Sequence, residues 1–161
     1  MMKFFSKRNL PKLILATALS VSALSAPLIV SAHGGASGVV KERMDLMDTT
    51  GEAMKKITAM FKRQQPYNAD EVARLSALIA SKGGENLTKL FPEHSMDKPT
   101  EALPAIWERW ERFESLAGQL TDQAQVLENA APQMMPNAMM SFMGLAKTCN
   151  DCHTEFRKKK E

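Results

Sequence analysis

Two thiols and an imidazole lie within five residues near the C-terminus, in the stretch Cys149-Asn150-Asp151-Cys152-His153. Cys-x-x-Cys-His is the attachment signature of a c-type haem. In this signature the thiols add across the haem vinyl groups as thioethers, and the imidazole binds the iron as proximal axial ligand. If the segment is helical, both thiols and the imidazole share one face and reach one flat macrocycle. The sequence therefore predicts one covalently bound haem c.

Other chemistries use the same pair of thiols. A dithiol redox motif is expected beside a βαβ pattern, and the chain has no strand-like runs. A structural zinc site needs four ligands, whereas the other histidines, His33 and His94, are distant in sequence. A disulfide between Cys149 and Cys152 within one helix would be strained. Haem attachment is the favoured interpretation, and the redox dithiol and the zinc site are its alternatives.

The N-terminus has the composition of an export signal. Residues 1–12 carry four basic residues and no acid, and residues 13–30 are apolar and uncharged. Small side chains at residues 30–32 suit a signal peptidase, so we expect a signal peptide over residues 1–32 that is cut after Ala32. An uncleaved membrane anchor is the alternative, because the apolar run approaches spanning length. Covalent attachment of this haem is completed outside the bacterial cytoplasm, so export predicts a periplasmic protein.

Removal of the leader changes the charge balance. The whole chain has 21 basic and 18 acidic residues, and the leader holds four of the basic ones. Residues 33–161, the expected mature domain, therefore carry 17 basic and 18 acidic residues, a net charge of −1. The chain has no stripe of basic residues of the kind that binds nucleic acid. We also find no catalytic constellation such as Ser/His/Asp, so we do not expect an enzyme.

Four helical stretches are expected to position the haem motif. The first runs from Val39 to about Arg63, a capping-box pattern opens the second at Asn68, and the third begins near Pro104. Asn137 is the candidate N-cap of the last helix. The expected inward seam of the first helix is Val40, Met44, Met47, Gly51, Met54, Thr58 and Phe61. That of the third is Ile106, Trp110, Phe113, Ala117, Leu120, Ala124, Leu127 and Ala131.

These helices predict an all-α fold. The mature chain is long enough for a single core, and four antiparallel helices with short connections make an up-down-up-down bundle. The pair Gly83-Gly84 is expected to bend or interrupt the second helix. On the last helix, Met139, Phe142, Ala146, Cys149 and His153 share one stripe, so the covalently bound haem should attach to the inward face.

Several motifs together resemble the class II c-type cytochromes, which are the cytochrome c′ family and its low-spin relatives. The haem motif lies near the C-terminus and continues to Phe156 and Arg157. Residues 104–107, Pro-Ala-Ile-Trp, are similar to the stretch that opens the family's third helix. Arg43, with Gly51 eight residues later, resembles the segment that crosses the distal side of the haem.

The resemblance implies a candidate for the sixth coordination position. In the family the residue four after the first-helix arginine faces the iron, and here that residue is Met47. It is usually a bulky non-ligand in cytochromes c′ proper, whereas a methionine there ligates iron in the low-spin relatives. The residues alone give a weaker argument: a thioether is a good haem ligand, and Gly51 leaves room for a flat ring one turn away. Met44, on the same seam, is the alternative ligand.

Two arginines are candidates for binding or tuning the haem. Arg43 lies one turn before Met47 and could pair with a propionate in bidentate geometry; the alternative is a solvated arginine on the helix face. Arg157 lies one turn after His153 and could tune the imidazole or a propionate.

The expected function is one-electron transfer in the periplasm. Its donors and acceptors would be periplasmic or membrane redox proteins. The alternative is a five-coordinate cytochrome c′ that binds nitric oxide or carbon monoxide at an open distal site. The resemblance also implies that a homodimer can form through the first two helices.

Overall fold

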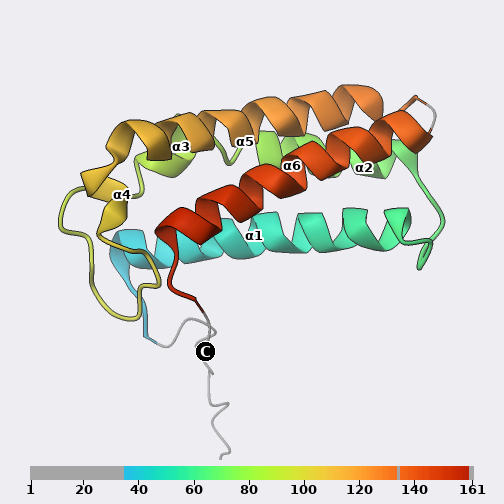
Figure 1. The fold of residues 1–161 in the computed structure, drawn as a ribbon. Coiled ribbons are helices and arrows are strands. Elements are labelled where there is room, and N and C mark those ends of the chain that lie inside the picture. Colours follow the sequence, from blue (N-terminus) through green and yellow to red (C-terminus); the bar gives the residue numbers. More distant parts are fainter. Residues whose placement is uncertain (1–34, 134, 160–161) are drawn as a thin grey trace, which may run out of the picture. The chain divides into compact units, whose positions relative to one another are not determined.

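Six helices, four of them long, make up the computed structural model, which describes residues 35–133 and 135–159. The helices are α1 (Gly38–Phe61), α2 (Ala69–Ala80), α3 (Glu85–Thr88), α4 (Ala105–Glu108), α5 (Trp110–Ala130) and α6 (Met135–Phe156). The long helices α1, α2, α5 and α6 lie side by side and alternate in direction (Figure 1). The prediction of an all-α, up-down-up-down four-helix bundle is confirmed. The predicted signal peptide, residues 1–32, lies outside the described residues.

The second helix begins and ends where the sequence predicts. Asn68 is the N-cap of α2, and its Oδ1 accepts a hydrogen bond from the backbone N–H of Glu71 at 3.0 Å. This bond satisfies one of the donors left free in the first helical turn. At the other end, Gly83-Gly84 separates α2 from the short α3. A Cβ at Gly83 would lie 2.5 Å from Thr121 Oγ1, so the link must be glycine where it crosses α5.

The predicted third helix is broken at one residue. Arg109 has φ −131° and ψ 48°, which separates α4 from α5. Its side chain donates to Glu155 of α6, and its guanidinium lies 4.7 Å from the centroid of the Phe156 ring. These are tertiary contacts, so no local pattern in the sequence marks the break. The predicted seam of this helix is otherwise confirmed at Phe113, Ala117, Leu120, Ala124, Leu127 and Ala131, which are buried, while Trp110 is half-buried.

The predicted inward seam of the first helix coincides only in part with the fully buried residues of α1. The buried residues of α1 are Val40, Arg43, Leu46, Thr50, Ala53, Ile57, Met60 and Phe61, of which the prediction contained only the first and last. Two of these, Arg43 and Thr50, are polar and interrupt the apolar pattern of the true core stripe. The methionines on the neighbouring stripe make that stripe look like the core. Met44, Met47 and Met54 are instead half-buried.

The last helix starts earlier than predicted. It begins at Met135, so Asn137 lies inside its first turn and is not the N-cap. The Asn137 side-chain amide donates to Gln133 Oε1 at 3.3 Å. Pro136 suits the first turn because a proline there loses no helical hydrogen bond.

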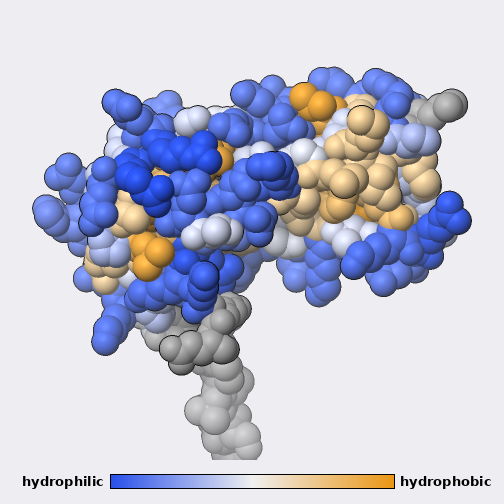
Figure 2. All heavy atoms as spheres, viewed as in Figure 1, coloured by the Kyte–Doolittle hydropathy of each residue, from blue (hydrophilic) through white to orange (hydrophobic). Residues whose placement is uncertain are grey.

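The two ends of the bundle differ in surface character. Apolar residues gather over the N-terminal half of α6 (Figure 2), where Met140 and Met143 are 73% and 64% exposed. Hydrophilic residues predominate at the opposite end, near α4 and the C-terminal end of α6, with a few apolar residues among them. Within residues 35–133 and 135–159, no helix has the length and apolar character needed to cross a bilayer.

Candidate haem site

A cavity of about 580 Å³ opens between α1, α5 and α6. This volume lies in the range of small-molecule and cofactor sites. Its wall on α1 includes Met44, Met47, Gly51 and Met54, its wall on α5 Phe113, Leu116 and Leu120, and its wall on α6 Ala146, Cys149, Cys152 and His153. The methionines of the predicted α1 seam therefore line one cavity with the C-terminal part of the predicted α6 stripe, which is Ala146, Cys149 and His153.

The three residues of the haem motif lie on one continuous helix. α6 extends to Phe156, so the i, i+3, i+4 spacing places Cys149, Cys152 and His153 on one face, and all three line the cavity. Both cysteines are free thiols and half-buried. Burial raises the pKa of Cys149, and burial together with the charge of Cys149 raises the pKa of Cys152 to about 11. Both thiols therefore keep their protons at neutral pH in the haem-free chain.

The environment of His153 favours its neutral form. Desolvation lowers the pKa of its imidazole, and the cationic Arg157 lowers it further, while Glu101 opposes the effect. A neutral imidazole presents a nitrogen lone pair to a metal, whereas the protonated ring has none free. No cluster of three or more His, Cys, Asp or Glu able to hold a metal ion occurs among the residues that the structure describes. Two thiols and one imidazole in this order are the donors of a c-type haem attachment motif.

The wall of α1 that faces this motif carries both candidate distal ligands. Met44 and Met47 line the cavity, and each is half-buried. Gly51, one turn after Met47, also lines it, and a Cβ there would meet no heavy atom within 4 Å. The structure thus brings the predicted sixth ligand and its alternative to the same cavity.

Arg43 lies at the cavity but is also bound to a loop. Its side chain is 4% exposed and donates to Ser95 Oγ at 3.2 Å, to the Ser95 carbonyl at 2.7 Å and to Thr100 Oγ1 at 2.6 Å. Its guanidinium also lies 4.8 Å from the centroid of the Phe91 ring. Burial lowers the pKa of Arg43, which the nearby Asp97 opposes. A guanidinium has five N–H donors, so these three bonds do not exhaust its capacity to bind a propionate.

Arg157 has a partner that the sequence did not reveal. Its Nε donates to Glu101 Oε2 at 2.6 Å, and both residues line the cavity. The backbone N–H of Lys158 donates to the Glu101 carbonyl at 2.8 Å, and Ala102 forms an isolated antiparallel bridge with Arg157. No sequence signal could have identified Glu101, because it lies in a loop 56 residues before Arg157.

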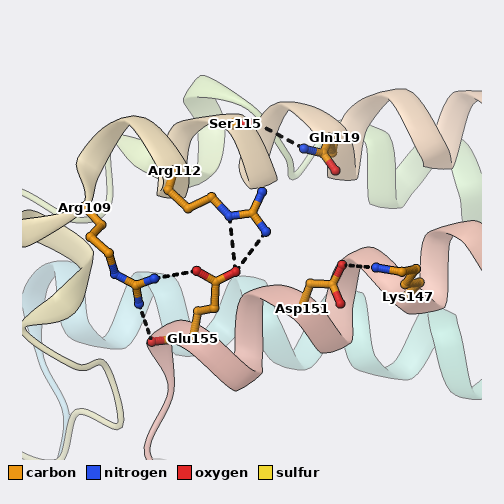
Figure 3. A network of polar contacts seen from close by, with 7 residues as sticks. All are labelled: Arg109, Arg112, Ser115, Gln119, Lys147, Asp151 and Glu155. Carbon is orange, nitrogen blue, oxygen red and sulfur yellow. Dashed lines mark hydrogen bonds and ion pairs between the residues drawn. The ribbon is translucent and has the colours of Figure 1, made fainter.

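A second charged cluster fixes the helical turn that carries the imidazole. Figure 3 shows Arg109 and Arg112 converging on Glu155, at 2.6 Å from Arg109 Nη1 and 2.8 Å from Arg112 Nη2. The hydrogen bond from Arg112 holds the pKa of the Glu155 carboxyl below its usual value. These contacts join the start of α5 to the end of α6 two residues after His153.

Known proteins resemble this chain in sequence and in fold. The family model described as Cytochrome C′ matches residues 38–157. The chain is 31% identical over 139 residues to a cytochrome c′ of Rhodopseudomonas palustris, covering 84% of this chain and 94% of the relative. It is 29% identical over 127 residues to a cytochrome c-556 of Agrobacterium tumefaciens, covering 77% and 100%. The solved structure of cytochrome c′ from Rhodopseudomonas palustris superposes with a TM-score of 0.73 at 30% identity, covering 78% of this chain and all of that one.

The residues at the cavity fit a haem. Apolar side chains from α1 and α5 supply walls for a flat macrocycle, while α6 contributes two thiols and a neutral imidazole with the spacing of covalent attachment. The family match spans every described helix from α1 to α6. The chain belongs to the cytochrome c′ family and is a monohaem c-type cytochrome.

Proposed function

We propose that this protein is a one-electron carrier whose haem is attached at Cys149 and Cys152 and ligated by His153 and Met47. One observation carries the proposal: Met47 of α1 lines the same cavity as the three motif residues of α6. The bound haem supplies a ferric/ferrous couple, and Met/His ligation raises its reduction potential. Ligation by one histidine and one methionine is the ligand set of the low-spin relatives of cytochrome c′.

The protein's part in this function is to hold the two ligands in place. Met47 and His153 come from different helices of one bundle, whose core residues are close-packed. Such a frame lets the ligands move little when the charge of the site changes, which keeps the reorganisation energy small. With both axial positions occupied by side chains, small molecules are kept from the metal.

Export accompanies this proposal. Residues 1–32 would act as a signal peptide and deliver the chain to the periplasm, where the family functions. Periplasmic or membrane redox proteins would donate and accept the electron. A homodimer through the first two helices is proposed with it, to be tested by light scattering of the haem-loaded protein.

A second candidate function is the binding of a diatomic gas, nitric oxide or carbon monoxide. The likeness to the cytochrome c′ of Rhodopseudomonas palustris favours it, as that relative covers most of the chain at 31% identity. In this case Met47 would fill the distal side of the cavity without ligating the iron. Met44 and Met54, which also line the cavity, would complete an apolar distal wall.

A visible absorption spectrum of the purified mature protein separates these candidates. We expect sharp, resolved bands on reduction that carbon monoxide does not move, because both axial positions are occupied. A broad reduced band that shifts with carbon monoxide would make gas binding the function. An absence of haem bands, after production in a host that matures c-type cytochromes, would contradict both.

A further inference from the structure

Glu101 and Arg157 form a charge pair on the wall of the haem cavity. Arg157 Nε donates to Glu101 Oε2 at 2.6 Å, and Arg157 Nη2 forms an ion pair with the same oxygen. Both side chains line the cavity together with His153. The pair therefore adds one negative and one positive charge to the surroundings of the proposed proximal ligand.

The backbone fixes both members of this pair. The N–H of Arg157 donates to the His153 carbonyl at 3.2 Å, which ties the arginine to the turn that carries the imidazole. On the other side, the Glu101 carbonyl accepts from Lys158, and the N–H of Leu103 donates to the Phe156 carbonyl at 2.9 Å. The loop at Glu101 is thus fastened to the end of α6, so the carboxylate stays beside the guanidinium.

The two charges of this pair favour opposite oxidation states of a haem bound in the cavity. A ferric site carries one more positive charge than a ferrous site, so a nearby carboxylate favours the oxidised form and a nearby guanidinium favours the reduced form. A balanced pair keeps the two influences close to cancellation.

Resting on the proposed haem site, we propose that Glu101 is the counter-charge of Arg157 and cancels most of the arginine's effect on the reduction potential of the haem. Loss of Glu101 leaves the arginine uncompensated and raises the potential. Loss of Arg157 leaves the carboxylate uncompensated and lowers it. The two side chains are 45% and 39% exposed, so added salt should reduce both shifts.

Spectroelectrochemical titration of the haem-loaded protein tests this with Glu101→Gln, Arg157→Gln and the double variant. We expect the reduction potential to rise in Glu101→Gln, to fall in Arg157→Gln and to lie close to the wild-type value in the double variant. The shifts of both single variants should be smaller at 0.5 M than at 0.05 M salt. Glu71→Gln is the matched control, because Glu71 pairs with Arg74 on α2 and does not line the cavity. It removes the same charge and should leave the potential unchanged.

Several outcomes would overturn the inference. The inference fails if the single variants keep the wild-type reduction potential, or if both shift it in the same direction. It also fails if the Glu71→Gln control shifts the potential as much as Glu101→Gln does. A lowered unfolding temperature without a change in potential would make the pair only a structural fastening. If Arg157→Gln fails to mature, the reduction potentials of Glu101→Gln and Glu101→Asp are compared instead. The aspartate variant keeps the negative charge and should keep the wild-type potential, whereas the glutamine variant should not. A wild-type protein without haem bands would instead contradict the proposed function.

Discussion

At the scale of single residues, two methionines of α1 are candidates for the proposed sixth ligand, because Met44 and Met47 both line the cavity. We expect Met47→Ala to convert a protein that does not react with carbon monoxide into one that binds it stoichiometrically when reduced. Its reduction potential should fall, since Met/His ligation raises the potential above that of imidazole alone. Difference spectra with carbon monoxide measure the first effect and a redox titration the second.

Met44→Ala is the matched control for this experiment. It removes the same side chain from the same helix and the same cavity, so the reduced protein should remain unreactive toward carbon monoxide. An unchanged Met47→Ala spectrum together with carbon monoxide binding by Met44→Ala would transfer the ligand role to Met44.

The thiols of α6 give a second prediction at this scale. Cys149 and Cys152 are free in the haem-free chain and line the cavity beside His153. Replacing both by serine should leave any bound haem extractable by acid-acetone, because no thioether then holds it. Single serine variants, with one thioether each, should retain it. Haem that resists extraction from the double variant would argue against attachment through these sulfurs.

At the scale of elements, the link between α2 and α3 controls how closely α2 approaches α5. The N–H of Gly84 donates to the Ala117 carbonyl at 2.7 Å, and a Cβ at Gly83 would lie 2.9 Å from the backbone nitrogen of Thr121. Because backbone cannot move aside as a side-chain end can, Gly83→Ala should reduce the free energy of unfolding by about 1–3 kcal/mol. Urea unfolding of the haem-loaded protein measures this loss.

Gly118→Ala is the control for the glycine prediction. Gly118 lies inside α5, and a Cβ there would meet no atom within 4 Å outside its own helix turn. The substitution should raise stability by about 0.5–1 kcal/mol, because alanine loses less backbone entropy in a helix. Equal effects of the two substitutions would show that the contact with Thr121 carries no energy.

At the scale of the whole molecule, the helices differ in how much they depend on the haem. α5 packs against both α2 and α6, whereas α1 packs chiefly against α2 and faces the cavity with its methionine stripe. A bound haem would join α1 to α6, so its binding free energy adds to the stability of that side of the bundle. Without it, α1 should open more readily than the remaining long helices.

Hydrogen exchange tests this dependence. Comparing the full-length mature chain with and without haem, we expect amides of α1 to exchange at least about tenfold faster in the haem-free chain, a difference of about 1.4 kcal/mol in opening free energy. Amides of α5 serve as the internal reference and should change less. A uniform change over all four long helices would mean that the bundle opens as one unit.

The sequence by itself determined the helical bundle and the cofactor. Helix positions follow from a local period of 3.6 residues, caps such as Asn68 and interruptions such as Gly83, all of which are written within short stretches of chain. The proposed attachment motif is local as well, because Cys149, Cys152 and His153 lie within about one and a half helical turns of one another. Met47 could be singled out only through a family resemblance, since a methionine on a helix face has many uses.

Only the tertiary structure decided which stripe of α1 is core, where α4 ends and what faces the haem cavity. Two neighbouring stripes of α1 are both apolar enough to be buried, and the choice between them depends on the helices packed against them. The buried Arg43 is tolerated because loop residues such as Ser95 accept its hydrogen bonds. The break at Arg109 and the pairing of Glu101 with Arg157 join residues some 50 positions apart. Sequence periodicity reports on neighbours along one helix, whereas such contacts arise only when the chain has folded.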